Sequence, residues 1–190
     1  MSLKSNFELM ADYNQWMNKS IYKAASGLSN SELSKNRGAF FNSIIGTLNH
    51  ILVGDIIWLK RFSKHPSQLK ALDSVRELQS PQSLNVILCD DFTSLLSARR
   101  KMDSAIQEFT HELTEDLLSS SLSYCDTKGK PFTKNFGHLI QHLFNHQTHH
   151  RGQVSTLLTQ AGIDVDVTDL LAKIPSEPFS EYVSVAFSEA

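Results

Sequence analysis

Cysteine is scarce in this sequence, and long apolar runs are absent from it. The two cysteines, Cys89 and Cys125, form no Cys-x-x-Cys pair, which favours two free thiols in a reducing compartment over a disulfide. No segment approaches the roughly 20 apolar residues that a membrane-spanning helix requires. Glu8 and Asp12 interrupt the N-terminal segment before it could form the apolar part of a signal peptide. We therefore predict a cytoplasmic protein with no membrane partner.

The chain also lacks an excess of basic charge. Its net charge is −2, its pI is about 6.4, and it has no Lys/Arg-rich run, which argues against nucleic acid as a partner. Of the 190 residues, 41% are hydrophobic and 20% are charged, as in an ordinary domain with a sizeable core. We expect one domain over residues 1–175 and a C-terminal tail over residues 176–190 that is a candidate interface arm.

Helical periodicity dominates what is present. Apolar residues recur at intervals of three and four in four segments, and a Ser-x-x-Glu pattern at Ser5 and Glu8 can cap the first of them. The third segment alternates steps of four and three from Leu88 to Leu113, the pattern of a helix that packs against other helices. The expected helices span residues 5–28, 43–62, 88–113 and 135–161. We predict an all-α fold, a four-helix bundle.

Two shorter segments connect these helices. Residues 63–82 contain two prolines and little periodicity, which predicts a connection with one short helix. Residues 122–133 are typical of a small β-hairpin before the last long helix, with its turn at residues 126–129. Pro131 cannot donate a ladder hydrogen bond, so we expect the second strand at an edge.

Histidine is concentrated in the last expected helix. Five of the eight histidines lie between His138 and His150. His146 and His150 are four residues apart, so their rings stack on one helix face, and both occupy positions where the apolar pattern demands burial. Two buried neutral imidazoles side by side need hydrogen-bond partners or a shared ligand. We interpret them as ligands of one divalent metal ion.

His50 is the best candidate for a third ligand. It lies beside the apolar stripe of the second helix, with Gly46 one turn before it and Gly54 one turn after it. A glycine inside a helix costs about 1 kcal/mol against alanine, so two of them indicate that something needs space beside this imidazole. Close packing of two helices would also use glycine. His142 remains open as a ligand, a donor behind the ligands, or a histidine bonded to a carbonyl.

Arg99 stands where the seam of the third helix expects an apolar residue. One interpretation is a contact with an anion or substrate. The other is an ion pair with a carboxylate such as Asp103, or a side chain that reaches water along its own stem.

Short motifs along most of the chain carry a family resemblance. The last expected helix contains the motif Asn145-His146-Gln147-Thr148-His149-His150-Arg151-Gly152-Gln153, and the second contains Gly46-Thr47-Leu48-Asn49-His50 followed by Asp55, Trp58 and Arg61. The first helix contains Tyr13-Asn14 with Trp16 and Asn18, and the third contains Arg99-Arg100 with Asp103. The remaining matches are Tyr124, Gly129 and Thr168-Asp169-Leu170. Together these motifs resemble the DinB (damage-inducible) family of the DinB/YfiT-like superfamily.

The resemblance implies an up–down–down–up four-helix bundle, often a homodimer. It implies a metal held by three histidines, zinc or nickel in several members, and these ligands map onto His50, His146 and His150. Fe, Mn or Co would also suit three imidazoles. Related members of the superfamily use low-molecular-weight thiols as cosubstrates, so a thiol and a small electrophile are the expected partners.

Two classes of function follow from an open three-histidine site. The first is a metal-dependent enzyme that transfers a thiol to a small electrophile or hydrolyses a substrate. Arg99 or Arg151 would then hold a substrate carboxylate, and Tyr124 would donate a hydrogen bond. The alternative is a non-enzymatic bundle that binds metal or a small ligand in a stress response.

Overall fold

The structure, a computed structural model, describes residues 2–177 and is mostly helical, with one two-stranded antiparallel sheet. The helices are α1 (Leu3–Ala25), α2 (Asn30–Ser34), α3 (Ile44–Phe62), α4 (Asp73–Arg76), α5 (Phe92–Glu112), α6 (Glu115–Ser119) and α7 (Phe136–Gln160), the 3₁₀ helices are η1 (Lys70–Leu72) and η2 (Leu170–Lys173), and the strands are β1 (Ser121–Cys125) and β2 (Pro131–Asn135). The expected interface arm spans residues 176–190, and its residues 178–190 lie outside the described part of the chain.

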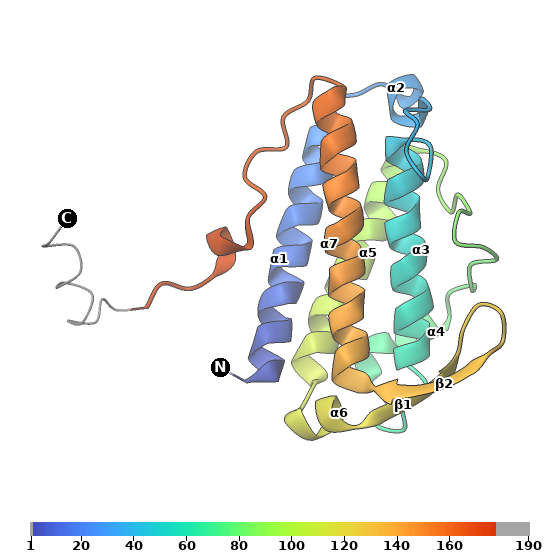
Figure 1. Cartoon of the computed structure of the whole chain (residues 1–190), viewed down its shortest axis with the longest axis vertical. Coiled ribbons are helices and arrows are strands. Elements are labelled where there is room, and N and C mark those ends of the chain that lie inside the picture. The colour runs from blue at the N-terminus through green and yellow to red at the C-terminus, as the bar shows by residue number, and fades with distance from the viewer. Residues whose placement is uncertain (1, 178–190) are drawn as a thin grey trace, which may run out of the picture.

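The long helices α1, α3, α5 and α7 lie side by side, with α7 between α1 and α3 (Figure 1). Helix α1 packs against α5 and α7, and α3 packs against α7. Helix α6 and the β1–β2 hairpin lie at one end of this group, and α2 lies at the other. Residues 77–91 contain no helix or strand and lead from α4 to α5. Within residues 2–177, no helix combines the length and the apolarity needed to cross a bilayer.

Several predicted boundaries are confirmed. Helix α3 begins after Ser43, whose hydroxyl accepts the Gly46 N–H, and α7 ends just before Gly162, which has a φ of +78°. The hairpin pairs Cys125 with Pro131 across the expected turn. The connection after α3 contains the short helices η1 and α4.

Two predicted helix starts are wrong. Helix α1 begins at Leu3 because Ser2 and Ser5 form the capping box, which the sequence pattern had placed at Ser5 and Glu8. Helix α5 begins at Phe92 because the Asp91 side chain caps it; Leu88 lies outside the helix, and its backbone N–H donates to a side chain of α3.

Aromatic side chains fill the core at the hairpin end. Phe62 of α3 stacks on Phe109 of α5, with ring centroids 5.7 Å apart, and meets Phe136 of α7 edge-on at 5.2 Å. All three rings are completely buried. Each contributes roughly 1.5–3 kcal/mol of burial free energy and joins three of the long helices.

Farther along the helices the core turns polar. Arg99 of α5 pairs with Asp55 of α3, and its Nε lies 3.0 Å from an oxygen of Asp103. Gln147 of α7 donates to the other Asp55 oxygen at 2.8 Å. Arg99 is 2% exposed and Asp55 is 0% exposed. The ion-pair interpretation of Arg99 is therefore confirmed, and Asp55 is a partner that sequence analysis did not identify.

Arg151 extends this polar network to α1. Its guanidinium donates to Asn14 and, at 3.2 Å, to Thr148 Oγ1. Asn14 and Asn18 each donate to Asp103, at 3.3 Å and 2.8 Å. All four long helices thus contribute to one buried network in which two arginines balance two aspartates.

The prediction that His146 and His150 occupy buried positions of the last helix is wrong by one residue. Gln147 and Arg151 are the buried positions, and His146 and His150 each precede one of them. One residue is about 100° of rotation in a helix, so the imidazoles lie at the edge of the core, half-buried, on the side of α7 that faces α3.

Candidate metal centre

Three imidazoles meet between α3 and α7. The Nε2 atom of His50 lies 3.1 Å from Nε2 of His146 and 3.2 Å from Nε2 of His150. One ligand atom of each of the three residues lies within 4.8 Å of the others. The structure thus brings together the three histidines that the sequence singled out, and they form a group that could hold a metal ion.

His50 is fixed in position from two sides. Its Nδ1 lies 2.7 Å from the backbone carbonyl oxygen of Leu84, in the segment between α4 and α5. The ring of Phe41, just before α3, stacks on the imidazole with centroids 3.7 Å apart and an interplanar angle of 16°. Only 5% of His50 is exposed. Because a carbonyl oxygen can only accept, Nδ1 carries the hydrogen and Nε2 presents a lone pair.

His150 has an equivalent partner on its own helix. Its Nδ1 lies 2.8 Å from Gln153 Oε1, an acceptor one turn farther along α7. Gln153 Nε2 in turn lies 3.3 Å from His149 Nε2. Nε2 of His150 therefore also presents its lone pair to the other imidazoles. Such acceptors behind the ring orient histidine ligands and raise their basicity in metal sites.

Gly54 provides the space for His146. A Cβ atom at position 54 would lie 2.5 Å from Cε1 and 3.0 Å from Nδ1 of the His146 ring. The Nδ1 atom of His146 is buried and has no hydrogen-bond partner among the described residues. A Cβ at Gly46 would lie 2.2 Å from the carbonyl oxygen of Phe41, the residue whose ring covers His50. The glycines were expected to leave space beside the His50 imidazole, but Gly54 makes room for the His146 ring and Gly46 for the Phe41 backbone.

Burial lowers the pKa of all three imidazoles from the usual value near 6.5. The Leu84 carbonyl opposes this shift at His50, and Gln153 opposes it at His150. At His146 the neighbouring imidazoles add to burial, and its pKa falls to about 3. The three rings are therefore neutral at pH 7, which is the state that binds metal.

The imidazoles form one wall of a pocket of about 550 Å³. Its lining includes Phe40 and Phe41 before α3, Trp58 and Arg61 on α3, and Asp126 in the hairpin turn. His142 also lines it and meets Trp58 edge-on, with ring centroids 4.9 Å apart, but does not join the group of three histidines. The size and the mixed apolar and polar lining suit a small molecule.

The three residues expected to contact substrate lie elsewhere. Arg99 and Arg151 are buried in the polar network, 2% and 3% exposed. Tyr124, in β1, packs against Trp58 and lies under the Arg61 guanidinium, whose central carbon is 5.0 Å from its ring. None of the three lines the histidine pocket. Their role as substrate contacts stays a prediction that these positions do not favour.

Sequence analysis overlooked three contributors to the site. The Leu84 backbone left no signal, because any residue has a carbonyl. Phe41 could have been noticed, since two adjacent aromatics directly precede a helix with an inward histidine. Arg61 appeared only as part of a family motif, without a role.

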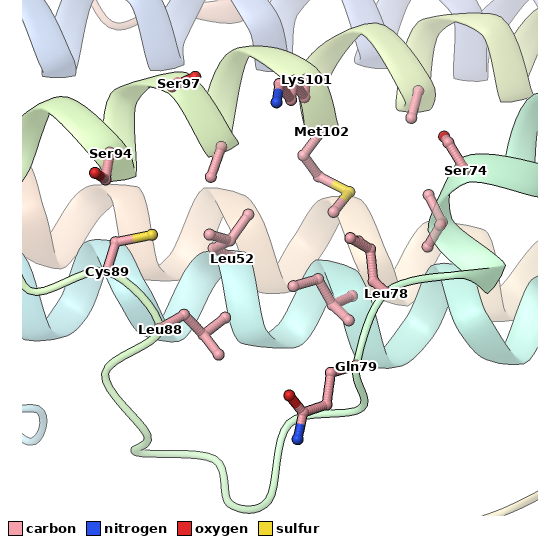
Figure 2. A pocket seen from close by; sticks show the side chains of 14 residues that line it. Leu52, Ser74, Leu78, Gln79, Leu88, Cys89, Ser94, Ser97, Lys101 and Met102 are labelled. Carbon is pink, nitrogen blue, oxygen red and sulfur yellow. The ribbon is translucent and has the colours of Figure 1, made fainter.

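A second pocket, of about 640 Å³, lies between α3 and α5. Figure 2 shows Leu52 and Met102 projecting into it from these helices, with Leu78 and Leu88 on the segment that borders it. In the described part of the chain, Lys101 is its only charged lining residue. The pocket is larger than the histidine pocket, but no group of metal ligands lines it, so we place the candidate site at the histidines.

Comparisons with known proteins identify the family of this chain. A model of the DinB family matches residues 1–181. Protein DinB of Bacillus subtilis (strain 168) is 23% identical over 166 residues, which cover 83% of this chain and 87% of that protein. The crystal structure of a DinB-like protein from Bacillus cereus ATCC 10987 is similar, with a TM-score of 0.51 and 22% identity over 80% of this chain and 89% of that one. The chain therefore belongs to the DinB family.

Proposed function

We propose that the protein binds one divalent metal ion through His50, His146 and His150 and uses it as a metal-dependent enzyme on small molecules. One observation carries the proposal. The Nε2 atoms of His50 and His150 lie 3.2 Å apart, and their Nδ1 partners leave both with lone pairs. Two facing lone pairs repel each other unless a cation lies between them. The lowered pKa values disfavour a proton in that place, so a metal ion is the cation that fits.

The spacing of the imidazoles supports this assignment. Metal–nitrogen bonds of about 2.0–2.1 Å place two histidine nitrogens about 2.9 Å apart at right angles and about 3.4 Å apart at the tetrahedral angle. The Nε2 atom of His50 lies 3.1 Å from that of His146 and 3.2 Å from that of His150, and both distances fall between these limits. Zinc and nickel are the ions we propose first, with Fe, Mn and Co as alternatives.

The pocket supports an open coordination position. Three neutral ligands leave the full charge of the ion, and an ion so held lowers the pKa of a bound water to about 7 or deprotonates a bound thiol. The surrounding residues shape the site. Phe41 and Trp58 form aromatic walls that exclude water, and Leu84 and Gln153 hold His50 and His150 in the tautomer that binds metal. We propose thiol transfer to a small electrophile as the first reaction to test, and hydrolysis as the second.

We also infer the up–down–down–up bundle that the resemblance implies. In Figure 1, α1 and α7 run in one direction and α3 and α5 in the other, which supports that topology. A homodimer and a cytoplasmic location remain proposals, to be tested by light scattering and by fractionation.

Metal content tests the proposal directly. We expect about one equivalent of metal, measured by mass spectrometry, in protein purified without a histidine tag. His50→Ala and His146→Ala should each lose it, whereas His138→Ala, on an exposed part of α7, should keep it. Metal-free protein that takes up neither zinc nor nickel would overturn the proposal. Metal binding without turnover in thiol-transfer and ester-hydrolysis screens would leave the non-enzymatic, ligand-binding alternative.

A further inference from the structure

Arg61 lies at the far end of the histidine pocket in an unusual setting. Its guanidinium carbon is 4.6 Å from the ring centroid of Trp58 and 5.0 Å from that of Tyr124. The two rings come from different elements, α3 and β1, and pack against each other at 5.4 Å. Aromatic contacts engage the face of a guanidinium, so its in-plane N–H groups remain free to donate.

No anion in the described part of the chain uses these donors. Among residues 2–177, the Arg61 side chain makes no ion pair and no hydrogen bond, although it is half-buried. The fully buried arginines differ, because Arg99 has two carboxylates and Arg151 has Asn14 and Thr148. Burial lowers the pKa of Arg61 from its usual value, although the nearby Tyr124, Asp126 and Cys125 oppose the shift. A half-buried cation with free donors facing a pocket favours an anionic ligand.

The acidic residue nearest in the pocket lining does not fill this role. Asp126 forms the hairpin turn, where its Oδ1 accepts the N–H groups of Lys128 and Lys130 at 2.8 Å and 2.9 Å. It makes no ion pair with Arg61.

The helix sets the distance between this cation and the imidazoles. His50, Gly54, Trp58 and Arg61 follow one another along the pocket side of α3. At 1.5 Å per residue, four residues separate Gly54, which the His146 ring touches, from Trp58 by about 6 Å. The guanidinium lies over Trp58. The gap to be spanned by a ligand is therefore on the order of 6–10 Å, one to two helical turns.

We propose that Arg61 binds the carboxylate of a small-molecule ligand whose opposite end reaches the three histidines. The ligand class is a small carboxylate whose opposite end lies about five or six bonds from the carboxyl carbon, a length that spans the estimated gap. Tyr124 and Trp58 position the guanidinium. This inference rests on the proposed function for the metal-binding end of the ligand and on Arg61 alone for the carboxylate end.

A series of thiols of increasing length tests the distance between Arg61 and the three histidines. Cobalt-loaded protein would be titrated with ω-mercaptocarboxylates of three to eight carbons and with the matching ω-mercaptoalcohols, following the thiolate-to-cobalt absorption. We expect acids near six carbons to bind about ten-fold more tightly than their alcohols, as one charged hydrogen-bonded contact warrants. Arg61→Gln should remove the preference for acids without changing cobalt stoichiometry or alcohol affinity, and Arg61→Lys should restore part of it. Arg100→Gln, at an exposed position on α5, is the matched control and should behave as the wild type.

A second measurement needs no metal. In a Trp16→Phe background, Trp58 is the remaining tryptophan and reports on the guanidinium beside it. Hexanoate should change its fluorescence in the metal-free protein, whereas hexanol and the Arg61→Gln variant should show no such response. Failure of cobalt to bind thiols, with the hexanoate response intact, would overturn the proposed function and support the anion site. Equal binding of acids and alcohols, or an unchanged preference in Arg61→Gln, would overturn the role of Arg61.

Discussion

At the scale of single residues, the candidate site depends on a missing side chain as much as on the imidazoles. His146 contributes its Nε2 only because position 54 of the facing helix has no Cβ. A glycine inside a helix costs about 1 kcal/mol relative to alanine, and α3 has two of them in its first three turns. Gly54 makes room for His146 and Gly46 for the Phe41 backbone beside His50, so the loss of helix stability is tied to the assembly of the three imidazoles.

We predict that Gly54→Ala impairs metal binding. The new Cβ would lie 2.5 Å from the His146 ring, so the imidazole must rotate or α7 must move, and His146 leaves the position 3.1 Å from His50. Zinc affinity, measured by competition with a chelating dye, should fall at least ten-fold, as it does when a ligand loses its orientation. Gly152→Ala is the matched control, because no atom lies within 4 Å of a Cβ there; it should keep zinc affinity and gain about 0.5–1 kcal/mol of stability. Equal zinc affinity in both variants would show that Gly54 does not shape the site.

At the scale of elements, the buried network sets how α7 faces its neighbours. Gln147 bonds to Asp55 of α3 and Arg151 to Asn14 of α1, so the rotation of α7 is defined at two successive turns. His146 and His150 precede these anchors by one residue each and are turned toward α3 as a result. Burial raises the pKa of Asp55 and Asp103, and the Arg99 guanidinium opposes both shifts. Each of these buried charges would destabilise the protein without its partner, so the network is stable only when all of its members are present.

We predict that Arg99→Met is strongly destabilising. It leaves the carboxylates of Asp55 and Asp103 buried without their cation, which costs about 3–5 kcal/mol when one partner of a buried pair is removed. Urea denaturation should show the midpoint falling accordingly, whereas Arg100→Met, one residue away and exposed, should stay within about 0.5 kcal/mol of the wild type. A stable Arg99→Met protein with impaired turnover would instead support the substrate contact considered from sequence.

Elements are also the scale at which sequence reasoning succeeded and then stopped. The ends of α3 and α7 and the hairpin followed from caps, periodicity and turn residues, all of which act within a few positions. The histidine trio could be found because two ligands share a helix face and the third is marked by glycines. The Asp55–Arg99 pair, the Leu84 carbonyl and the start of α5 depend on contacts between residues far apart in the chain, such as the bond from Leu88 N–H to Asn49. No local pattern encodes those.

At the scale of the whole molecule, the site links three parts of the chain that are distant in sequence. Helix α3 contributes one imidazole, α7 two, and the segment between α4 and α5 the Leu84 carbonyl behind His50. Such a site exists only in the folded chain, so we expect the proposed metal binding to be coupled to folding. A ligand at 100 times its Kd adds about 2.7 kcal/mol of stability by mass action.

Proton binding is also coupled to folding, and this coupling predicts how the stability of the metal-free protein depends on pH. The pKa values of His50, His146 and His150 are lowered on folding, to about 3 for His146, while in the unfolded chain each stays near 6.5. Below pH 6.5 the unfolded chain therefore binds more protons than the folded chain, so these groups make the free energy of unfolding fall as the pH falls. Urea midpoints in the presence of a chelator should decline from pH 7.5 to pH 5.5, and less steeply in His146→Leu, which removes the ring with the largest shift. Added zinc should raise the midpoint at pH 7.5, where all three folded imidazoles are neutral and protons do not compete with the ion. Parallel pH profiles for the wild type and His146→Leu would contradict the burial of three neutral imidazoles at one site.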